Sequence, residues 1–453
     1  MTLFFKLYQF LNQKCISEHP LLLALSGGPD SLALFYSLLE YRTKTNRTFH
    51  VAHVDHQWRE ESAQEAQALL ELCANYSVPF HLKVLNPKEL KGNLEAACRE
   101  ERYQFFSEIY QKHDLQAVLT GHHQNDHVET VLKRIFEGAH WSKWDSLKEE
   151  NFIHGMKILR PFLQVEKKDL QQMIENYSFI PFKDSTNQDY SYLRPRLRDK
   201  ILPWLNQAFG KKIEPALISI SKETNELNQY FEEKLEPLLK SVSQGPWGVM
   251  LDLQSCLPDH LLEIRHLIRL FCQKYGFATS RTIIEQASIA LKTGSANQLF
   301  IFNHKKLRVD RKRVYIDYFI EQFMKPMHIF STGNYFFHNW HLNIQEMVYT
   351  DQFKPTSWKE GIQGQLQICV PIQDLTLGWM DKRNKCISLR TLRKNWSEKK
   401  IPAFLYYRFP FLWNKDEIKH EFLTGDTAFH LKNGMPCWKI ELKHTDHLNQ
   451  NKL

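Results

Sequence analysis

Paired cysteines are missing from this chain. Its eight cysteines are spread over 453 residues, and the two nearest, Cys256 and Cys272, stand 16 positions apart. Zinc ribbons and dithiol redox centres need Cys-x-x-Cys pairs, so neither zinc nor an iron–sulfur cluster is expected. Scattered single cysteines suit a reducing compartment, and we expect a cytoplasmic protein.

Long apolar runs are also missing. The longest apolar stretches are far shorter than the roughly 20 residues that cross a bilayer, so no membrane partner is expected. Residues 1–11 are rich in Phe and Leu, but Lys6 and Gln9 interrupt them and no small-residue cleavage site follows, which is typical of an amphipathic first helix. With 43% hydrophobic residues and no internal repeat, the chain is expected to form about three globular domains.

The charge balance leaves two interpretations open. A formal net charge of +8 suits a polyanionic partner, but also a mildly basic enzyme, because 51 acidic residues dilute it. The distribution is more informative. Residues 382–419 hold eleven Lys or Arg against three acids, with Trp396, Tyr406, Tyr407 and Trp413 among them. Basic and aromatic side chains together suit phosphate contact and base stacking.

A glycine-containing loop near the start lacks the lysine of a Walker phosphate loop. This loop, Ser26, Gly27, Gly28, Pro29, Asp30 and Ser31, follows the apolar run 21–25, which is typical of a strand buried on both faces of a parallel sheet. The glycines let backbone N–H groups approach phosphate oxygens, the serines add hydroxyl donors, and the proline suits a first helical turn. A carboxylate beside phosphates requires a bridging cation, so we assign Asp30 to Mg²⁺. An ordinary turn capped by serine is the alternative.

The first half of the chain alternates strand and helix patterns. Strand-like runs recur at 48–54, 80–85, 115–120 and 157–159, and helical patterns fill 30–41, 60–76 and 93–113. This alternation predicts an α/β domain with a doubly wound parallel sheet, ending near residue 210. Ligands of such sheets bind at the carboxyl ends of the strands, so motifs that follow strands should gather there.

The second half is different in character. Helical patterns at 214–242, 257–275 and 280–292 predict a mainly helical middle domain, closed by a strand pair at 299–302 and 313–316. The pair flanks a predicted basic turn containing Lys305, Lys306, Arg308, Arg311 and Lys312, which suits either a solvated hairpin or nucleic-acid contact. Short strands with Gly and Pro turns follow from residue 330, which predicts a small α+β C-terminal domain. The predicted boundaries are 1–212, 213–320 and 321–453.

Two histidine-rich strings follow predicted strands. One contains His53, and the other runs through His122, His123, Asp126, His127 and Glu129. His123 and His127 have the i,i+4 spacing of zinc ligands on a helix, but no third ligand is evident. Asp126 and Glu129 would present two carboxylates on one helical face, where they either receive an ammonium group or merely complement the helix dipole.

Arginines form further candidate contacts. Arg99 and Arg102 share one face of a predicted helix, which is by default a solvated face. Arg194, Arg196 and Arg198 alternate after a polar loop that contains Asp184, Asn187 and Asp189. Arginine is suited to bidentate phosphate contact, so these groups are candidates for binding anionic intermediates or RNA.

The phosphate loop resembles that of the N-type ATP pyrophosphatases, which split ATP into AMP and pyrophosphate. Together with the Asn-x-Glu-x-x-x-Arg-x-x-Arg-Tyr segment from Asn93, the His-His-x-x-Asp-x-x-Glu-Thr segment from His122, the Arg160-Pro161 pair and the polar loop at 184–189, it resembles the tRNA(Ile)-lysidine synthetases. The likeness covers residues 20–200 in order and spacing. It extends to the segment 392–402 of the C-terminal region.

The resemblance implies an activity. It is the ATP-dependent attachment of free L-lysine to C2 of the wobble cytidine in the CAU anticodon of tRNA(Ile), through an adenylated cytidine, which changes decoding from Met to Ile codons. It further implies ATP at residues 26–31 and His53, catalytic roles for Asp30, Asp126, Glu129 and Arg198, and a homodimer in many relatives. Candidate substrate and RNA contacts are Arg99, Arg102, Asp184, Asn187, Asp189, Arg194, Arg196, Arg393, Lys394, Lys399 and Lys400.

Three positions depart from the family pattern: Trp58 replaces the usual Leu, Pro195 replaces Asn, and Tyr406 replaces an expected Arg. None removes a group that the chemistry requires. Three other functions compete with this interpretation. A tRNA thiolase is disfavoured because Cys-x-x-Cys pairs are missing, and a small-molecule synthetase with the same loop would not need the basic aromatic segment. The third alternative is an RNA-binding protein with an inactive loop.

Overall fold

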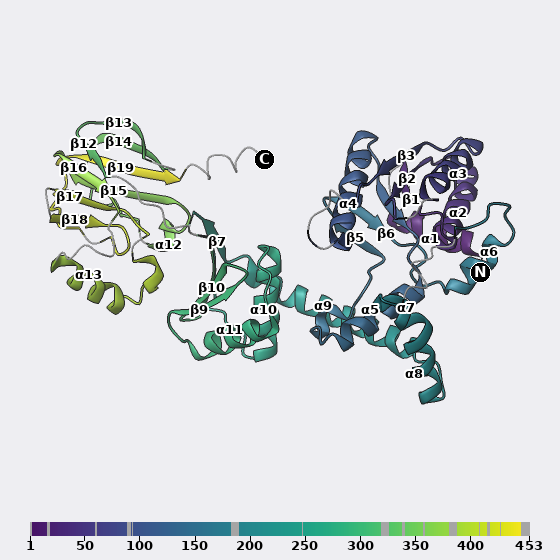
Figure 1. Cartoon of the computed structure of the whole chain (residues 1–453). Helices are drawn as coiled ribbons and strands as arrows, with labels where there is room; N and C mark the ends of the chain where they lie inside the picture. Colours follow the sequence, from purple (N-terminus) through teal and green to yellow (C-terminus); the bar gives the residue numbers. More distant parts are fainter. Residues whose placement is uncertain are drawn as a thin grey trace. The chain divides into compact units, whose positions relative to one another are not determined.

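The computed structural model describes residues 2–15, 19–58, 61–87, 92, 94–182, 190–246, 248–318, 326–337, 340–356, 358–379, 387–406, 408–414, 417–425 and 427–444. The chain forms two compact units, residues 1–228 and 229–453. Figure 1 labels the helices and strands of both units. The division into three domains at 212 and 320 stays a prediction. No helix in the described ranges is both long and apolar enough to cross a membrane.

The first unit contains the predicted doubly wound sheet. Its six strands lie in the order β3-β2-β1-β4-β6-β5, where β1 is Leu21–Ala24, β2 Phe49–Asp55, β3 Phe80–Val84, β4 Ala117–Thr120, β5 Glu150–Ile153 and β6 Met156–Leu159. All neighbours are parallel except β5, which pairs with β6 as an antiparallel edge. The predicted strands and the fold class are confirmed.

Helices cover both faces of this sheet (Figure 1). They are α1 (Leu3–Lys14), α2 (Pro29–Thr45), α3 (Ser62–Asn75), α4 (Leu94–Lys112) and α6 (Lys167–Ile174), whereas α5 (Gln124–Phe136) packs with the helices that follow the sheet. Successive residues of β1 belong to different cores: Leu21 and Leu23 pack with α2, while Leu22 packs with α4 residues such as Phe106. Because side chains alternate across a strand and both faces are covered, the whole run is apolar.

A helical arm follows the sheet. It consists of α7 (Leu193–Arg196), the π-helical turn η3 (Leu197–Ile201), α8 (Leu202–Phe209) and α9 (Glu214–Leu239). Val128, Val131 and Leu132 of α5 form a small core with Leu197 and Leu202 of this arm. The arm therefore holds the arginines at 194–198 beside α5. Single π-helical turns occur frequently at functional sites.

In the second unit, the middle region contains more sheet than predicted. The helices α10 (Leu261–Lys274) and α11 (Arg281–Thr293) confirm the helical patterns, but they accompany a five-stranded sheet with the order β7-β8-β11-β10-β9. These strands are β7 (Val242–Gly245), β8 (Gly248–Asp252), β9 (Gln298–Phe302), β10 (Lys305–Asp310) and β11 (Arg313–Asp317).

The predicted basic turn was wrong, because most of it is strand β10. This strand lies between β9 and β11 and pairs antiparallel with both. The connections are two-residue turns at Asn303-His304 and Arg311-Lys312, and all four of these residues have positive φ. Such turns favour glycine or asparagine, and only Asn303 among these four residues fits that preference, so the sequence gave little indication of two hairpins.

The remainder of the second unit consists of two four-stranded antiparallel sheets and helix α13 (Ile387–Glu398). One sheet has the order β12-β16-β17-β18 and the other β13-β14-β19-β15. Their strands are β12 (Met327–Ile329), β13 (Gly333–Phe337), β14 (Trp340–Val348), β15 (Gln365–Pro371), β16 (Leu375–Gly378), β17 (Phe411–Asn414), β18 (Glu417–Glu421) and β19 (Pro436–His444). Two short helices, α12 (Trp358–Gly361) and η4 (Ala403–Leu405), also belong to the second unit, whereas the short helix η1 (Trp141–Lys143) belongs to the first. Trp396 of α13 is fully buried in their core, which also includes Met250 and Tyr315 of the middle region.

Candidate active site

The phosphate loop has the local structure that its sequence predicts. Gly28 is the N-cap of α2, Pro29 begins the helix, and no described side chain caps its first N–H groups. The loop is instead held by serines: the Ser31 hydroxyl donates to the Gly28 carbonyl (3.0 Å) and lies 3.1 Å from the Ser26 hydroxyl. An uncapped helix N-terminus after a glycine turn offers several N–H donors to an anion.

Two glycines permit close approaches around this loop. Gly27 has φ +81°, and a Cβ there would meet the ring of Phe182 at 2.3 Å. Gly121, directly after β4, lies so close to the start of α2 that a Cβ would stand 3.0 Å from the Ser31 nitrogen. The loop after β4 therefore abuts the phosphate loop, and a larger residue at either position would displace it.

Asp30 meets the requirement for a cation ligand. Its Oδ1 atom is buried and has no hydrogen-bond partner in the described part of the chain. The other oxygen, Oδ2, lies 3.4 Å from Nε2 of the buried His123. A buried carboxylate oxygen without a donor is costly unless a ligand or ion satisfies it. The residues present therefore fit a magnesium ion, whose ligands are oxygens.

An open cavity of about 340 Å³ lies at the carboxyl ends of β1, β2 and β4. The residues that line it come from these strand ends, the phosphate loop and helices α3 and α4: Ala24, Leu25, Ser26, Gly28, Asp30, Ser31, Ala52, His53, Val54, Asp55, His56, Gln57, Trp58, Ser62, Glu65, Arg102, Tyr103, Phe106, Thr120, Gly121, His122 and Asp126. This is the edge of the sheet at which doubly wound folds bind ligands.

His53 is oriented by the neighbouring strand. Its Nδ1 lies 2.8 Å from the Leu25 carbonyl oxygen, which accepts a hydrogen bond from that nitrogen. Burial lowers the pKa of His53, so the ring is neutral and its Nε2 is an acceptor. The backbone bond fixes the tautomer and presents that acceptor at the cavity.

Three arginines act on His122, and a fourth, Arg99, neighbours them. Burial, with smaller effects of Arg160, Arg102 and Arg194, lowers the pKa of this histidine to about 4, while Asp126 acts in the opposite direction. Arg99 and Arg194 also lower the pKa of Arg102, after burial. None of these four arginines has an ion-pair partner among the described residues. Arg102 lines the cavity and belongs to a group of neighbouring arginines whose positive charge suits phosphates or RNA, while Asp30, Asp55, Glu65 and Asp126 line the same cavity.

The two carboxylates at the start of α5 have different surroundings. Asp126 lines the cavity and forms a capping box with His123: the His123 N–H donates to Asp126 Oδ2 (3.1 Å), and the Asp126 N–H donates to His123 Nδ1 (3.3 Å). Glu129 is 2% exposed and accepts two hydrogen bonds from Arg198, Nε to Oε1 at 2.8 Å and Nη2 to Oε2 at 3.4 Å. This pair also raises the pKa of Arg198.

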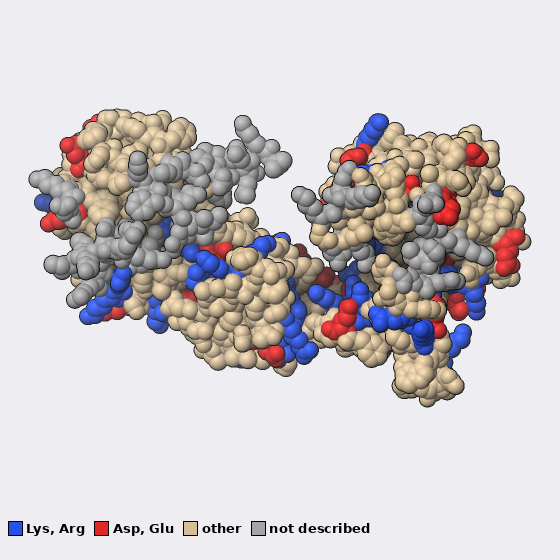
Figure 2. All heavy atoms as spheres, in the orientation of Figure 1, with Lys and Arg blue, Asp and Glu red and all other residues tan. Residues whose placement is uncertain are grey.

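The structure brings together part of the predicted site. The loop residues 26–31, His53, Arg102 and Asp126 meet at the cavity or its rim, and Glu129 with Arg198 lies beside it. Arg99, Arg194 and Arg196 are exposed. Asp184, Asn187 and Asp189 lie outside the described residues. Arg393, Lys394, Lys399 and Lys400 are exposed in the second unit, and Figure 2 shows Lys and Arg side chains on both units with acidic side chains among them.

Several cavity residues were not in the predicted site. Asp55 is buried and accepts a hydrogen bond from the Gln57 N–H at 2.8 Å, and Tyr103 stacks under the guanidinium groups of Arg99 and Arg102. Trp58 is 49% exposed and stacks on His56, with ring centroids 4.8 Å apart. Asp55 ends β2 and Trp58 follows it, so their position at the carboxyl end of a strand was the available indication.

Comparisons with known proteins agree with this geometry. A family model of the PP-loop domain matches residues 2–205. A tRNA(Ile)-lysidine synthase of Protochlamydia amoebophila is 40% identical over 438 residues, which cover 96% of each chain. This chain belongs to the tRNA(Ile)-lysidine synthase family. Membership implies the use of ATP.

Other similar proteins cover less of the chain. A family member from Chlamydia pneumoniae is 36% identical over 283 residues, which span 62% of this chain and 88% of that protein. Among solved structures, a U34-tRNA thiolase from Methanococcus maripaludis with its [4Fe-4S] cluster covers 50% of this chain and 78% of that one, at 16% identity and a TM-score of 0.40.

Proposed function

We propose that this protein is a tRNA-modifying ligase that forms lysidine. It joins the ε-amine of L-lysine to C2 of the wobble cytidine in the CAU anticodon of tRNA(Ile), with release of AMP and pyrophosphate, in the cytoplasm. The observation that supports the proposal is the combination, at one cavity, of the phosphate loop with its uncapped helix N-terminus, the unsatisfied Asp30 carboxylate oxygen and Arg102, which has Arg99 and Arg194 as neighbours.

The first step activates the base. The C2 oxygen of cytidine attacks the α-phosphorus of ATP, the bond to the β-phosphate oxygen breaks, and pyrophosphate leaves. We assign the backbone N–H groups of Gly27, Gly28, Asp30 and Ser31 and the two serine hydroxyls to the phosphates, because they surround the N-terminus of α2. Asp30 would hold Mg²⁺, which when bound neutralises phosphate charge. Arg102 and Arg160 stabilise the negative charge that remains on the adenylate.

The second step replaces AMP. The lysine ε-amine forms a bond to C2, the bond from C2 to the adenylate oxygen breaks, and the amine loses a proton. Asp126 is the carboxylate of α5 that reaches the cavity, so we assign it to the ammonium group of lysine. Glu129 acts as a positioning residue, because both of its oxygens hold Arg198.

The tRNA requires a larger surface than the cavity. Arg194 and Arg196 are exposed on the helical arm, and Arg393, Lys394, Lys399 and Lys400 are exposed on or just after α13. We assign these side chains to phosphate contacts, which predicts tRNA affinity that falls steeply with salt. The homodimer stays a prediction, and light scattering after size-exclusion chromatography measures it.

The test is incorporation of radiolabelled lysine into total tRNA with ATP and Mg²⁺. Asp30→Ala should abolish both incorporation and pyrophosphate release. Asp169→Ala is the matched control, because Asp169 occupies the first turn of α6 as Asp30 occupies the first turn of α2, but does not line the cavity. Retained turnover in Asp30→Ala would overturn the metal assignment, and unlabelled tRNA with the wild-type protein would overturn the substrate.

A further inference from the structure

Three histidines gather at the end of the sheet opposite the cavity. His50 is the second residue of β2, His81 is the second residue of β3, and His113 follows the last turn of α4. Because β2 and β3 are parallel, their amino ends lie together at one end of the sheet, and the cavity lies at the opposite end, where their carboxyl ends meet. Asp55 stands five residues after His50 in β2, so these two ends are roughly 16 Å apart.

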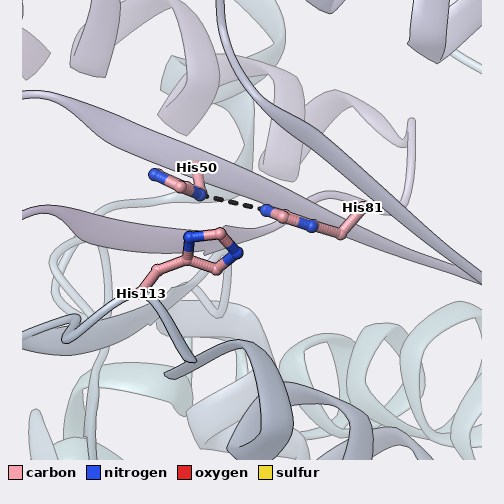
Figure 3. A group of neighbouring side chains, drawn as sticks. All are labelled: His50, His81 and His113. Atoms are coloured by element: carbon pink, nitrogen blue, oxygen red, sulfur yellow. Dashed lines mark hydrogen bonds between the residues drawn. The ribbon is translucent and has the colours of Figure 1, made fainter. Parts of the chain in front are cut away.

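The three rings face one another. One nitrogen from each ring lies within 4.8 Å of the corresponding nitrogens of the other two. His50 Nδ1 and His81 Nε2 are 3.0 Å apart, and the ring of His113 lies 4.7 and 5.0 Å from the other two ring centroids. Figure 3 shows the rings converging from three separate segments. Metal–nitrogen bonds of about 2.0–2.1 Å at tetrahedral angles place ligand nitrogens about 3.3 Å apart, so small ring rotations complete such a site.

The donor set selects the kind of metal. Three imidazoles and no carboxylate suit zinc and similar borderline divalent ions, whereas Mg²⁺ and Ca²⁺ require oxygen ligands. All three rings are partly buried, and the neighbouring Lys112 is exposed. Burial and the other two rings lower the pKa of His50 to about 4, so its ring is neutral. Neutral imidazole is the form that binds metal.

We propose that His50, His81 and His113 bind one zinc ion or a similar divalent transition-metal ion, with water as the fourth ligand. The ion fastens β3, the edge strand of the sheet, to β2 and to the end of α4. Its role is structural, because it lies a strand length away from the phosphate loop. This proposed site differs from the expectation that the protein binds no zinc, because that expectation considered only cysteine pairs and His123 with His127.

The experiment uses the full chain without a histidine tag, stripped with EDTA and dialysed. Zinc sulfate is titrated against a chromophoric chelator to give stoichiometry and affinity. We expect one equivalent bound with a micromolar or lower dissociation constant, and a rise in the Tm of the first unit of about 5–10 °C at saturating zinc. X-ray absorption at the zinc edge should report three imidazole nitrogens. Absence of saturable binding, or a first shell of oxygen alone, would overturn the proposal.

Variants locate the ion. His50→Gln, His81→Gln and His113→Gln should each weaken zinc binding at least tenfold, while His430→Gln, an exposed histidine of the second unit, should leave it unchanged. Asp30→Ala should also retain the ion, which separates this site from the proposed magnesium site. Unchanged affinity in all three variants, or loss in Asp30→Ala, would place the ion elsewhere. The wild-type absorption spectrum decides the question by itself where a variant fails to fold.

Discussion

The ion pair between Glu129 and Arg198 allows a quantitative test of how α5 and the helical arm are held together. Arg198→Met removes both hydrogen bonds and leaves a carboxylate that is 98% buried without a partner. Breaking a fully buried pair costs about 3–5 kcal/mol. The Arg198 side chain retains 27% of its exposure, so water can reach the vacated position, and we expect about 2–3 kcal/mol.

This loss can be measured by thermal unfolding. For a unit of this size, 1 kcal/mol corresponds to about 2–4 °C, so the Tm of the first unit should fall by about 4–12 °C in Arg198→Met. Arg196→Met is the matched control: this arginine is exposed and, among the described residues, donates only to the Tyr192 carbonyl at 3.3 Å, so the Tm of this variant should change by no more than about 2 °C.

A double variant completes the test. Glu129→Gln with Arg198→Met removes both charges, and most of the lost stability should return because no unpaired carboxylate remains. Equal Tm values for Arg198→Met and the wild type would refute the argument, as would an equal fall in Arg196→Met. Lysine kinetics separate the roles: if Glu129 acts through Arg198, Glu129→Gln and Arg198→Met lower kcat by similar factors. A raised KM for lysine in Glu129→Gln alone would indicate direct contact.

In the second unit, Asp317→Ala should lower the free energy of unfolding in urea by about 3–5 kcal/mol, because the fully buried carboxylate pairs with Arg308 and with both terminal nitrogens of Arg408 at 2.8 Å. The control is Lys419→Ala, which removes an ion pair with Glu417 at the surface and should cost about 1 kcal/mol or less. An equal loss of stability in the two variants would contradict the reasoning. Burial lowers the pKa of His266 to about 4, so the unfolded chain binds a proton between pH 6.5 and 4 that the folded chain does not; stability should fall as pH falls through that range, and His266→Phe should flatten the decline, which denaturation at several pH values measures. Trp58 lines the cavity with its ring 49% exposed, so we expect a base of tRNA or ATP to stack on it, which contributes about 1–3 kcal/mol. Trp58→Ala should therefore raise the KM for one of these substrates about 5- to 100-fold, whereas Trp58→Phe should keep the KM unchanged. Unchanged KM values for both substrates in Trp58→Ala would exclude stacking.

Patterns along single elements determined much of this protein. The apolar run 21–25 and the alternation after it predicted a parallel sheet, and β1, β2, β4 and β6 lie where they were expected, because a strand buried on both faces must be apolar throughout. The phosphate loop could also be predicted, because its glycines, proline and carboxylate lie within six consecutive residues. Helices α2, α3 and α4 begin and end within a few residues of their predicted bounds, except that α2 extends to Thr45.

Packing between distant segments decided the rest. Glu129 and Arg198 stand 69 positions apart, and their pairing depends on how the helical arm lies against α5. The same holds for the arginines around His122 and for the three histidines at the far edge of the sheet. In β10, Arg308 suggested a basic turn, yet it bonds the buried Asp317. Periodicity reports which face of one element is buried, whereas these contacts depend on strand register and on which elements become neighbours, which only the folded chain determines.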